Sequence, residues 1–165
     1  MRNKSQRGYT LIELLVTIGI LGVIAPAIGI AIFQVFSVYS LSTNHLTAVK
    51  QVENAVYRIS RDTEMAQTIQ TGGISGFPLN LTWVEWNNTS NNVTYTIQNG
   101  VLQRAYSVNG SQSTTTLVAR HINIDPGETI CQYSNGVLSL NITASLGGFR
   151  PASETRVCRI VPRSQ

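Results

Sequence analysis

The pattern of hydrophobic positions begins with one long apolar run. From Tyr9 to Tyr39 nearly every residue is apolar, and no charged residue occurs between Glu13 and Lys50. About 20 apolar residues cross the hydrocarbon core of a bilayer as a helix, so the run predicts a transmembrane helix. A buried core helix is the alternative, but 165 residues are too few to enclose an apolar rod of this length.

The pattern then becomes amphipathic, with hydrophobic residues every three or four positions. The predicted apolar face comprises Leu46, Val49, Val52, Val56, Ile59, Ala66 and Ile69, with Thr63 at its one polar step. The opposite face carries Lys50, Asn54, Arg58, Arg61 and Glu64, and Arg58 is spaced to pair with Asp62 one turn later. Gly72-Gly73 is expected to end the helix. We therefore expect one helix from about Thr10 to Ile69, transmembrane over 9–40 and packed against a head over 41–70.

Residues 71–165 show the two-residue alternation of half-buried strands. It is clear in Val93–Ile97 and Leu138–Ile142, and Asn99-Gly100 is a strong hairpin signal. Further strands are predicted at Leu79–Trp86, Val101–Tyr106, Leu117–Ile124 and Arg156–Val161. These six short strands predict an antiparallel sheet resting on the second half of the helix, which makes the fold α+β.

The charges are few and unevenly placed. Only 12% of residues are charged, which excludes a charge-rich disordered chain and gives no evidence of a nucleic-acid-binding face. Arg2, Lys4 and Arg7 lie within the first eight residues, where no acidic residue occurs. Basic residues ahead of the apolar run predict a cytoplasmic N-terminus and a head on the other side of the membrane. A secretory signal peptide is the competing interpretation, but the run is too long for it and contains Glu13.

The segment Arg7-Gly8-Tyr9-Thr10-Leu11-Ile12-Glu13-Leu14-Leu15-Val16 resembles the class III signal of type IV pilins and type II secretion pseudopilins. The likeness rests on a basic leader ending in Gly8, an aromatic residue, a glutamate five residues after the glycine, and the apolar run. It implies that a prepilin peptidase removes residues 1–8, cutting after Gly8, and N-methylates Tyr9. The family more often has phenylalanine or methionine at that position.

The resemblance also implies an assembly role for Glu13. A carboxylate inside an apolar span costs roughly 2.5–3.5 kcal/mol on insertion scales, which marks it as functional. In the family this glutamate is thought to neutralise the terminal amine of a neighbouring subunit. Gly22 and Pro26 interrupt the same helix, and Pro26 predicts a kink or local melting because it removes one backbone hydrogen bond. Ordinary tolerance of Gly and Pro in transmembrane helices is an equal alternative.

The run Val93-Thr-Tyr-Thr-Ile-Gln-Asn-Gly-Val-Leu-Gln-Arg104 is similar to a hairpin of the minor pilin and pseudopilin group that contains PilW, PulJ and GspJ. A late strand with Arg156 and Arg159 fits that group too. This second resemblance implies a low-copy subunit that initiates or caps a filament.

The remaining signals are weaker. Cys131 and Cys158 are an even pair in an exported head, which favours a disulfide, with two free thiols as the alternative. His45 and His121 are not at ligand spacing from the cysteines, so no metal site or cofactor is expected. Trp83 and Trp86 are interpreted as core residues in preference to a subunit contact.

Together these features predict a non-enzymatic filament subunit, a minor pilin or pseudopilin. Its expected partners are the prepilin peptidase, other pilins or pseudopilins, an inner-membrane assembly platform and the membrane itself. A single-pass protein of a bacterial cytoplasmic membrane that then enters a periplasmic or cell-surface filament is the expected location. The alternatives are a membrane-anchored extracytoplasmic binding or adhesin module and a major pilin.

Overall fold

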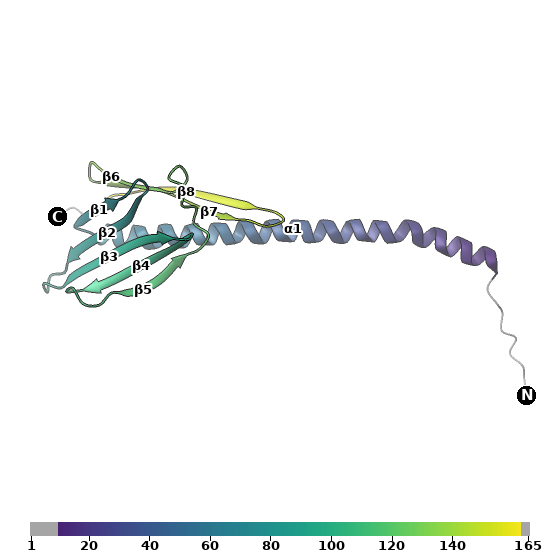
Figure 1. The fold of residues 1–165 in the computed structure, drawn as a ribbon, viewed down its shortest axis with the longest axis horizontal. Coiled ribbons are helices and arrows are strands. Elements are labelled where there is room, and N and C mark those ends of the chain that lie inside the picture. Colours follow the sequence, from purple (N-terminus) through teal and green to yellow (C-terminus); the bar gives the residue numbers. More distant parts are fainter. Residues whose placement is uncertain (1–9, 163–165) are drawn as a thin grey trace, which may run out of the picture. The chain divides into compact units, whose positions relative to one another are not determined.

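A computed structural model of the chain describes residues 10–162, which form two compact units that divide between Ser40 and Leu41. One helix, α1 (Leu11–Met65), contributes to both (Figure 1). Eight strands follow it in the second unit. The fold is therefore α+β and pilin-like, with one long N-terminal helix whose second half packs on antiparallel sheets.

Within the first unit, α1 is continuous and presents apolar side chains to its surroundings. Leu11, Leu15, Ile18, Leu21 and Phe36 are each more than half exposed. Within the described residues, α1 is the one helix long and apolar enough to cross a membrane.

The strands form two antiparallel sheets where the sequence predicted one. The larger sheet has the order β1-β2-β3-β4-β5, and the smaller sheet has the order β6-β7-β8. Their bounds are β1 (Thr68–Gly72), β2 (Gly76–Val84), β3 (Ser90–Gln98), β4 (Val101–Val108), β5 (Thr114–Ala119), β6 (Ile130–Ser134), β7 (Val137–Leu146) and β8 (Ala152–Ile160).

Both sheets bury one face against the second half of α1. The helix contributes Ala48, Val52, Ala55 and Ile59 to the core, all fully buried. Alternate residues of the strands complete it, among them Leu79, Leu81, Val93, Leu102, Leu138, Leu140, Ile142 and Ala144. Two-residue alternation therefore places the core residues of β2, β3 and β7 correctly. On the helix, the predicted apolar face was wrong at Leu46, which is 56% exposed.

The sheets are joined at one end by backbone hydrogen bonding. The amide of Cys131 on β6 donates to the carbonyl of Ser75, which precedes β2 (2.8 Å). Gly76 lies beside this contact with φ of +81°, and a Cβ there would come within 1.7 Å of the Cys131 carbonyl oxygen. Only glycine fits this position without displacing β6.

The helix ends earlier than its sequence pattern predicted, at Met65 instead of Ile69. The next residues hydrogen-bond to β2, because Gln67 donates its amide to Thr82 O and its side chain bonds both backbone groups of Val84. Thr68 and Ile69 then begin β1, which the sequence had placed at the end of the helix. Strand β6 was also missed, and the segment predicted at 117–124 is shared between β5 and an isolated bridge from Ile122 to Ala144.

Candidate functional site

The first turn of α1 is closed by a reciprocal pair of hydrogen bonds between Thr10 and Glu13. The Glu13 carboxylate accepts from the Thr10 amide and the Thr10 hydroxyl, both at 3.1 Å, and the Glu13 amide donates to Thr10 Oγ1 at 3.4 Å. This arrangement is a capping box, in which the first orphan donors of a helix are satisfied by side chains. The carboxylate also lies where the positive end of the helix dipole stabilises it.

Glu13 is the one acidic residue in the apolar half of α1. It is exposed at the helix N-terminus, on the same segment as the exposed apolar side chains. Because its local partners are neutral groups, the Glu13 carboxylate can still pair with a cation that approaches this end of the helix. Gly8 and Tyr9, the predicted cleavage and methylation positions, lie outside the described residues.

Gly22 and Pro26 lie within an unbroken helix. The kink or local melting expected at Pro26 stays a prediction. Proline removes only one amide donor, and the carbonyl its ring would crowd belongs to Gly22, four residues earlier. A Cβ added at Gly22 would have no neighbour within 4 Å.

In the head, a buried carboxylate links the helix to the larger sheet. Asp62 on α1 is 5% exposed and accepts from Tyr95 Oη at 2.6 Å and from Arg104 Nε at 2.6 Å. Arg104 Nη2 adds a second contact to the same carboxylate at 3.2 Å. We call this group the Asp62 cluster, comprising Asp62, Tyr95 and Arg104. Burial, followed by the hydrogen bond to Asp62, raises the pKa of Tyr95 above its ordinary value, so this phenol stays a donor.

The Asp62 cluster gives Tyr95 and Arg104 of the segment 93–104 a common partner. Tyr95 on β3 and Arg104 on β4 are directly paired across the hairpin, so their side chains share the face toward α1. The tyrosine and the arginine of the motif therefore bind one helix carboxylate from two adjacent strands. The predicted pairing of Asp62 with Arg58 was wrong, because Asp62 faces inward and Arg58 is exposed.

The two cysteines are free thiols, and the predicted disulfide does not form. Cys131 on β6 and Cys158 on β8 are both paired with Leu140, so strand β7 separates them. Two strand spacings amount to about 10 Å, whereas a disulfide needs Cα atoms within roughly 7 Å. Burial raises the pKa of the Cys131 thiol to about 12, which keeps it protonated and unreactive.

Trp86 also departs from its prediction. Trp83 is 9% exposed and stacks with Tyr106 at a centroid distance of 6.5 Å, as expected for a core residue. Trp86 is 98% exposed in the β2–β3 connection. The sequence could have predicted this exposure, because Trp86 lies beyond the last buried position in the alternation of β2.

No group of three or more His, Cys, Asp or Glu side chains in residues 10–162 is arranged to hold a metal ion. His121 is exposed, and Asp125 accepts the amide of Gly127 in a local turn. The Thr10–Glu13 pair caps α1, and the Asp62 cluster attaches it to the larger sheet.

Comparison with known families gives a match at the N-terminus. Residues 3–25 match the family model described as the prokaryotic N-terminal methylation motif. The comparisons with curated proteins and with solved structures found no match. The matched segment contains Lys4 and Arg7 of the basic leader, Gly8, Tyr9, the Thr10–Glu13 capping box and the first turns of the apolar helix. The chain therefore carries the N-terminal methylation motif of the type IV pilin and pseudopilin class, and it has the pilin-like architecture of one long helix and an antiparallel β head.

Proposed function

We propose that this chain is a minor pilin or pseudopilin, a structural subunit that prepilin peptidase cuts between Gly8 and Tyr9 and that an inner-membrane platform inserts into a pilus-like filament. The observation that carries the proposal is the match at residues 3–25 together with one carboxylate in an exposed apolar helix. An N-terminal methylation motif belongs to structural subunits, so the proposal assigns the protein no catalysis.

In this proposal the apolar half of α1 first lies in the cytoplasmic membrane, with the basic leader inside and the head outside. Cleavage frees the α-amino group of Tyr9 at the edge of the bilayer. Glu13 of one subunit would pair with that amine on a neighbouring subunit as both leave water. A buried pair adds little net stability, but an unpaired buried charge is costly, so the pair selects one register.

The capping box competes with the proposed pairing of Glu13 and the neighbour's amine. In the isolated chain the Glu13 carboxylate already accepts two hydrogen bonds from Thr10. Pairing with a neighbour's amine must retain or replace them, and a helix cap is worth about 1 kcal/mol. A buried charged pair adds little net stability, so we expect the Glu13 carboxylate to keep its hydrogen bonds to Thr10 when it pairs with the amine.

The minor-subunit assignment rests on the hairpin motif of residues 93–104. Its Tyr95 and Arg104 hold the helix through Asp62, so the motif is a device for attaching the head to α1. Copy number in sheared filaments tests this assignment: a few copies for each filament support a minor subunit, and bulk abundance indicates a major pilin.

Assembly itself is tested by replacing Glu13 and measuring the chain in the sheared filament fraction. Glu13→Leu is expected to lower incorporation at least about tenfold, while Glu13→Asp retains part of it. Thr17→Val, one turn further along the same helix, serves as the matched control and is expected to assemble normally. Equal incorporation of Glu13→Leu and wild type would reject the proposed role of Glu13. Binding of a ligand by a head that never enters filaments would favour the adhesin alternative.

A further inference from the structure

Trp86 is presented to solvent by a short, hydrogen-bonded turn between β2 and β3. Its side chain is 98% exposed, although tryptophan is normally highly buried. The turn is closed by the Glu85 amide donating to Thr89 O and the Asn88 amide donating to Glu85 O, both at 2.9 Å. The Thr89 amide also donates to Asn87 Oδ1 at 3.0 Å. The indole is therefore held on a fixed frame.

A buried amide connects this turn to the sheet. Asn91 is 1% exposed and donates from Nδ2 to Glu85 Oε1 at 3.2 Å. Its Oδ1 accepts from Tyr106 Oη at 2.6 Å. An exposed aromatic side chain on a rigid support loses little conformational freedom on binding, which is the property of an interface anchor.

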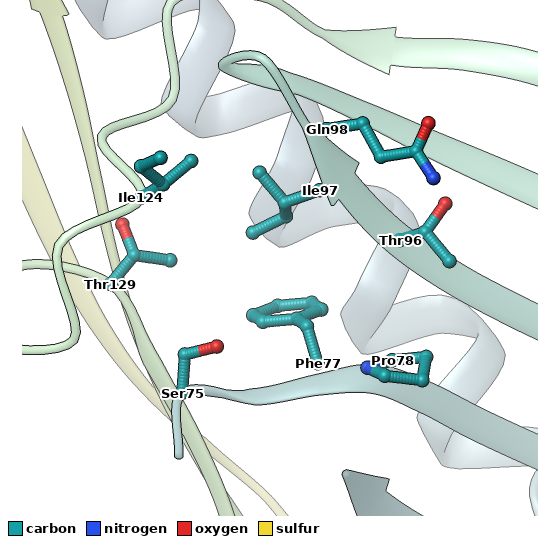
Figure 2. Close-up of a pocket in the computed structure, with 8 residues that line it drawn as sticks. All are labelled: Ser75, Phe77, Pro78, Thr96, Ile97, Gln98, Ile124 and Thr129. Carbon is teal, nitrogen blue, oxygen red and sulfur yellow. The ribbon is translucent and has the colours of Figure 1, made fainter. Parts of the chain in front are cut away.

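A pocket lies at the opposite end of the same pair of strands. It has a volume of about 360 Å³, at the small end of the range for ligand pockets. Its lining is uncharged: Phe77, Pro78, Ile97 and Ile124 are apolar, and Ser75, Thr96, Gln98 and Thr129 are neutral and polar. Figure 2 shows Ile97 above the ring of Phe77, with Ile124 and Thr129 on a separate segment across the open space.

The pocket and the exposed indole are complementary in chemistry. Apolar walls accept the ring, and hydroxyl and amide oxygens around the rim can accept the indole N–H, which needs a partner once it leaves water. A charged ligand such as a phosphate would find no opposite charge among the lining residues.

The two features cannot meet within one chain. Strand β2 begins at Gly76 beside the pocket and ends at Val84 beside the turn, so its nine residues separate them by about 25–30 Å. Strand β3 covers the same span in reverse, from Ser90 to Gln98 (Figure 1). A projection at one end and a socket at the other make a head-to-tail contact between copies geometrically natural.

We propose that Trp86 of one copy inserts into the pocket formed by residues 75–78, 96–98, 124 and 129 of a second copy. The contact is heterologous, since the two copies use different surfaces, so it links two neighbouring heads head to tail and does not close a symmetric dimer. The proposed contact rests on the proposed function in one respect: the apolar helices must hold copies of the chain side by side in a membrane or filament.

That setting is needed because the contact is small. One aromatic side chain contributes about 150–250 Å², well below the roughly 1,200–2,000 Å² of a stable interface. Free heads in dilute solution would therefore associate weakly. Copies tethered in one bilayer have a high effective concentration, and the same contact then orders neighbouring heads.

The test replaces Trp86 with the photoreactive p-benzoylphenylalanine in the full chain, in cells where it is inserted in the membrane. This side chain keeps an aromatic ring and captures whatever lies against it. The expected result is a crosslinked dimer of the chain whose second peptide, mapped by mass spectrometry, contains residues 75–78, 96–98 or 124–129.

Two matched variants make the test specific. Ile124→Glu places a charge at the mouth of the pocket, at a side chain that is 61% exposed, and should lower crosslinking at least about fivefold. Leu117→Glu makes the same change on β5 at a side chain that is 52% exposed and outside the pocket, and should leave crosslinking unchanged.

The proposal is overturned by the absence of a crosslink, by a crosslink to a different subunit or to another surface of the chain, or by a dimer that Ile124→Glu does not reduce. The N-terminal mass of the same material measures leader removal independently of the crosslink. A correctly cleaved chain without the crosslink would reject this contact and leave the proposed function standing.

Discussion

Replacing Asp62 by alanine is predicted to loosen the head from α1. The substitution leaves Tyr95 Oη and the Arg104 guanidinium without their acceptor in the interior. Removing one partner of a buried pair costs about 3–5 kcal/mol. The Arg104 side chain retains 19% exposure and can reach water, so the cost should lie at the low end of this range. We therefore expect a loss of about 3 kcal/mol in the free energy of unfolding.

The measurement is urea denaturation of the full chain in detergent, followed by tryptophan fluorescence. Trp83 reports unfolding directly, since it is buried in the head and stacks with Tyr106. Glu64→Ala, an exposed acid on the same helix, is the matched control and should change stability by no more than about 0.5 kcal/mol.

A double-mutant cycle with Arg104→Ala isolates the pair. If the two residues act through the described contact, the double variant should be more stable than the sum of the single losses predicts, with a coupling of at least about 1 kcal/mol. Additive losses, or a cost for Asp62→Ala below about 1 kcal/mol, would refute the view that this cluster fastens the helix to the sheet.

Four further predictions concern other positions. Gly76→Ala should cost more than about 3 kcal/mol in the same denaturation assay, because its Cβ meets the Cys131 carbonyl, whereas Gly110→Ala, with a similar φ and open space around it, should cost about 1 kcal/mol. In native protein a thiol reagent should label Cys158 and spare Cys131 until the head unfolds, and simultaneous labelling would contradict the burial of Cys131. Because the pKa of Cys131 is raised to about 12, the unfolded chain loses this proton first, so stability should fall as pH rises from about 9 to 12 and Cys131→Ala should reduce that fall. Thr10→Ala removes the helix cap and should lower helix stability by about 1 kcal/mol, measured by hydrogen exchange at the first turn, with no change expected in the head.

The features that were predictable from sequence are those that depend on near neighbours. The continuous apolar run before Tyr39 identifies the helix, and the two-residue alternation in β2, β3 and β7 identifies the buried strand faces. The Asn99-Gly100 turn was predictable because it depends on two adjacent residues, and both adopt the positive φ that such a turn requires. The N-terminal motif is recognisable from its residues because all of them are contiguous in the chain.

The features that were missed depend on partners far away in the chain. Asp62 meets Arg104 across 42 positions, so its spacing from Arg58 pointed to the wrong partner. Helix propensity could not place the end of α1, because the residues after Met65 are held by hydrogen bonds to β2. The cysteines illustrate the same limit, since a count of two favours a bond but the position of β7 between them prevents it.

The most direct test of the central claim is the intact mass of the chain isolated from membranes of a host that has prepilin peptidase. We expect a species lacking residues 1–8, beginning at Tyr9 and heavier than that sequence by one N-terminal methyl group. A Gly8→Glu variant, which blocks entry of the leader into an extended protease site, should retain all residues. A wild-type chain that keeps residues 1–8 under these conditions would contradict the account.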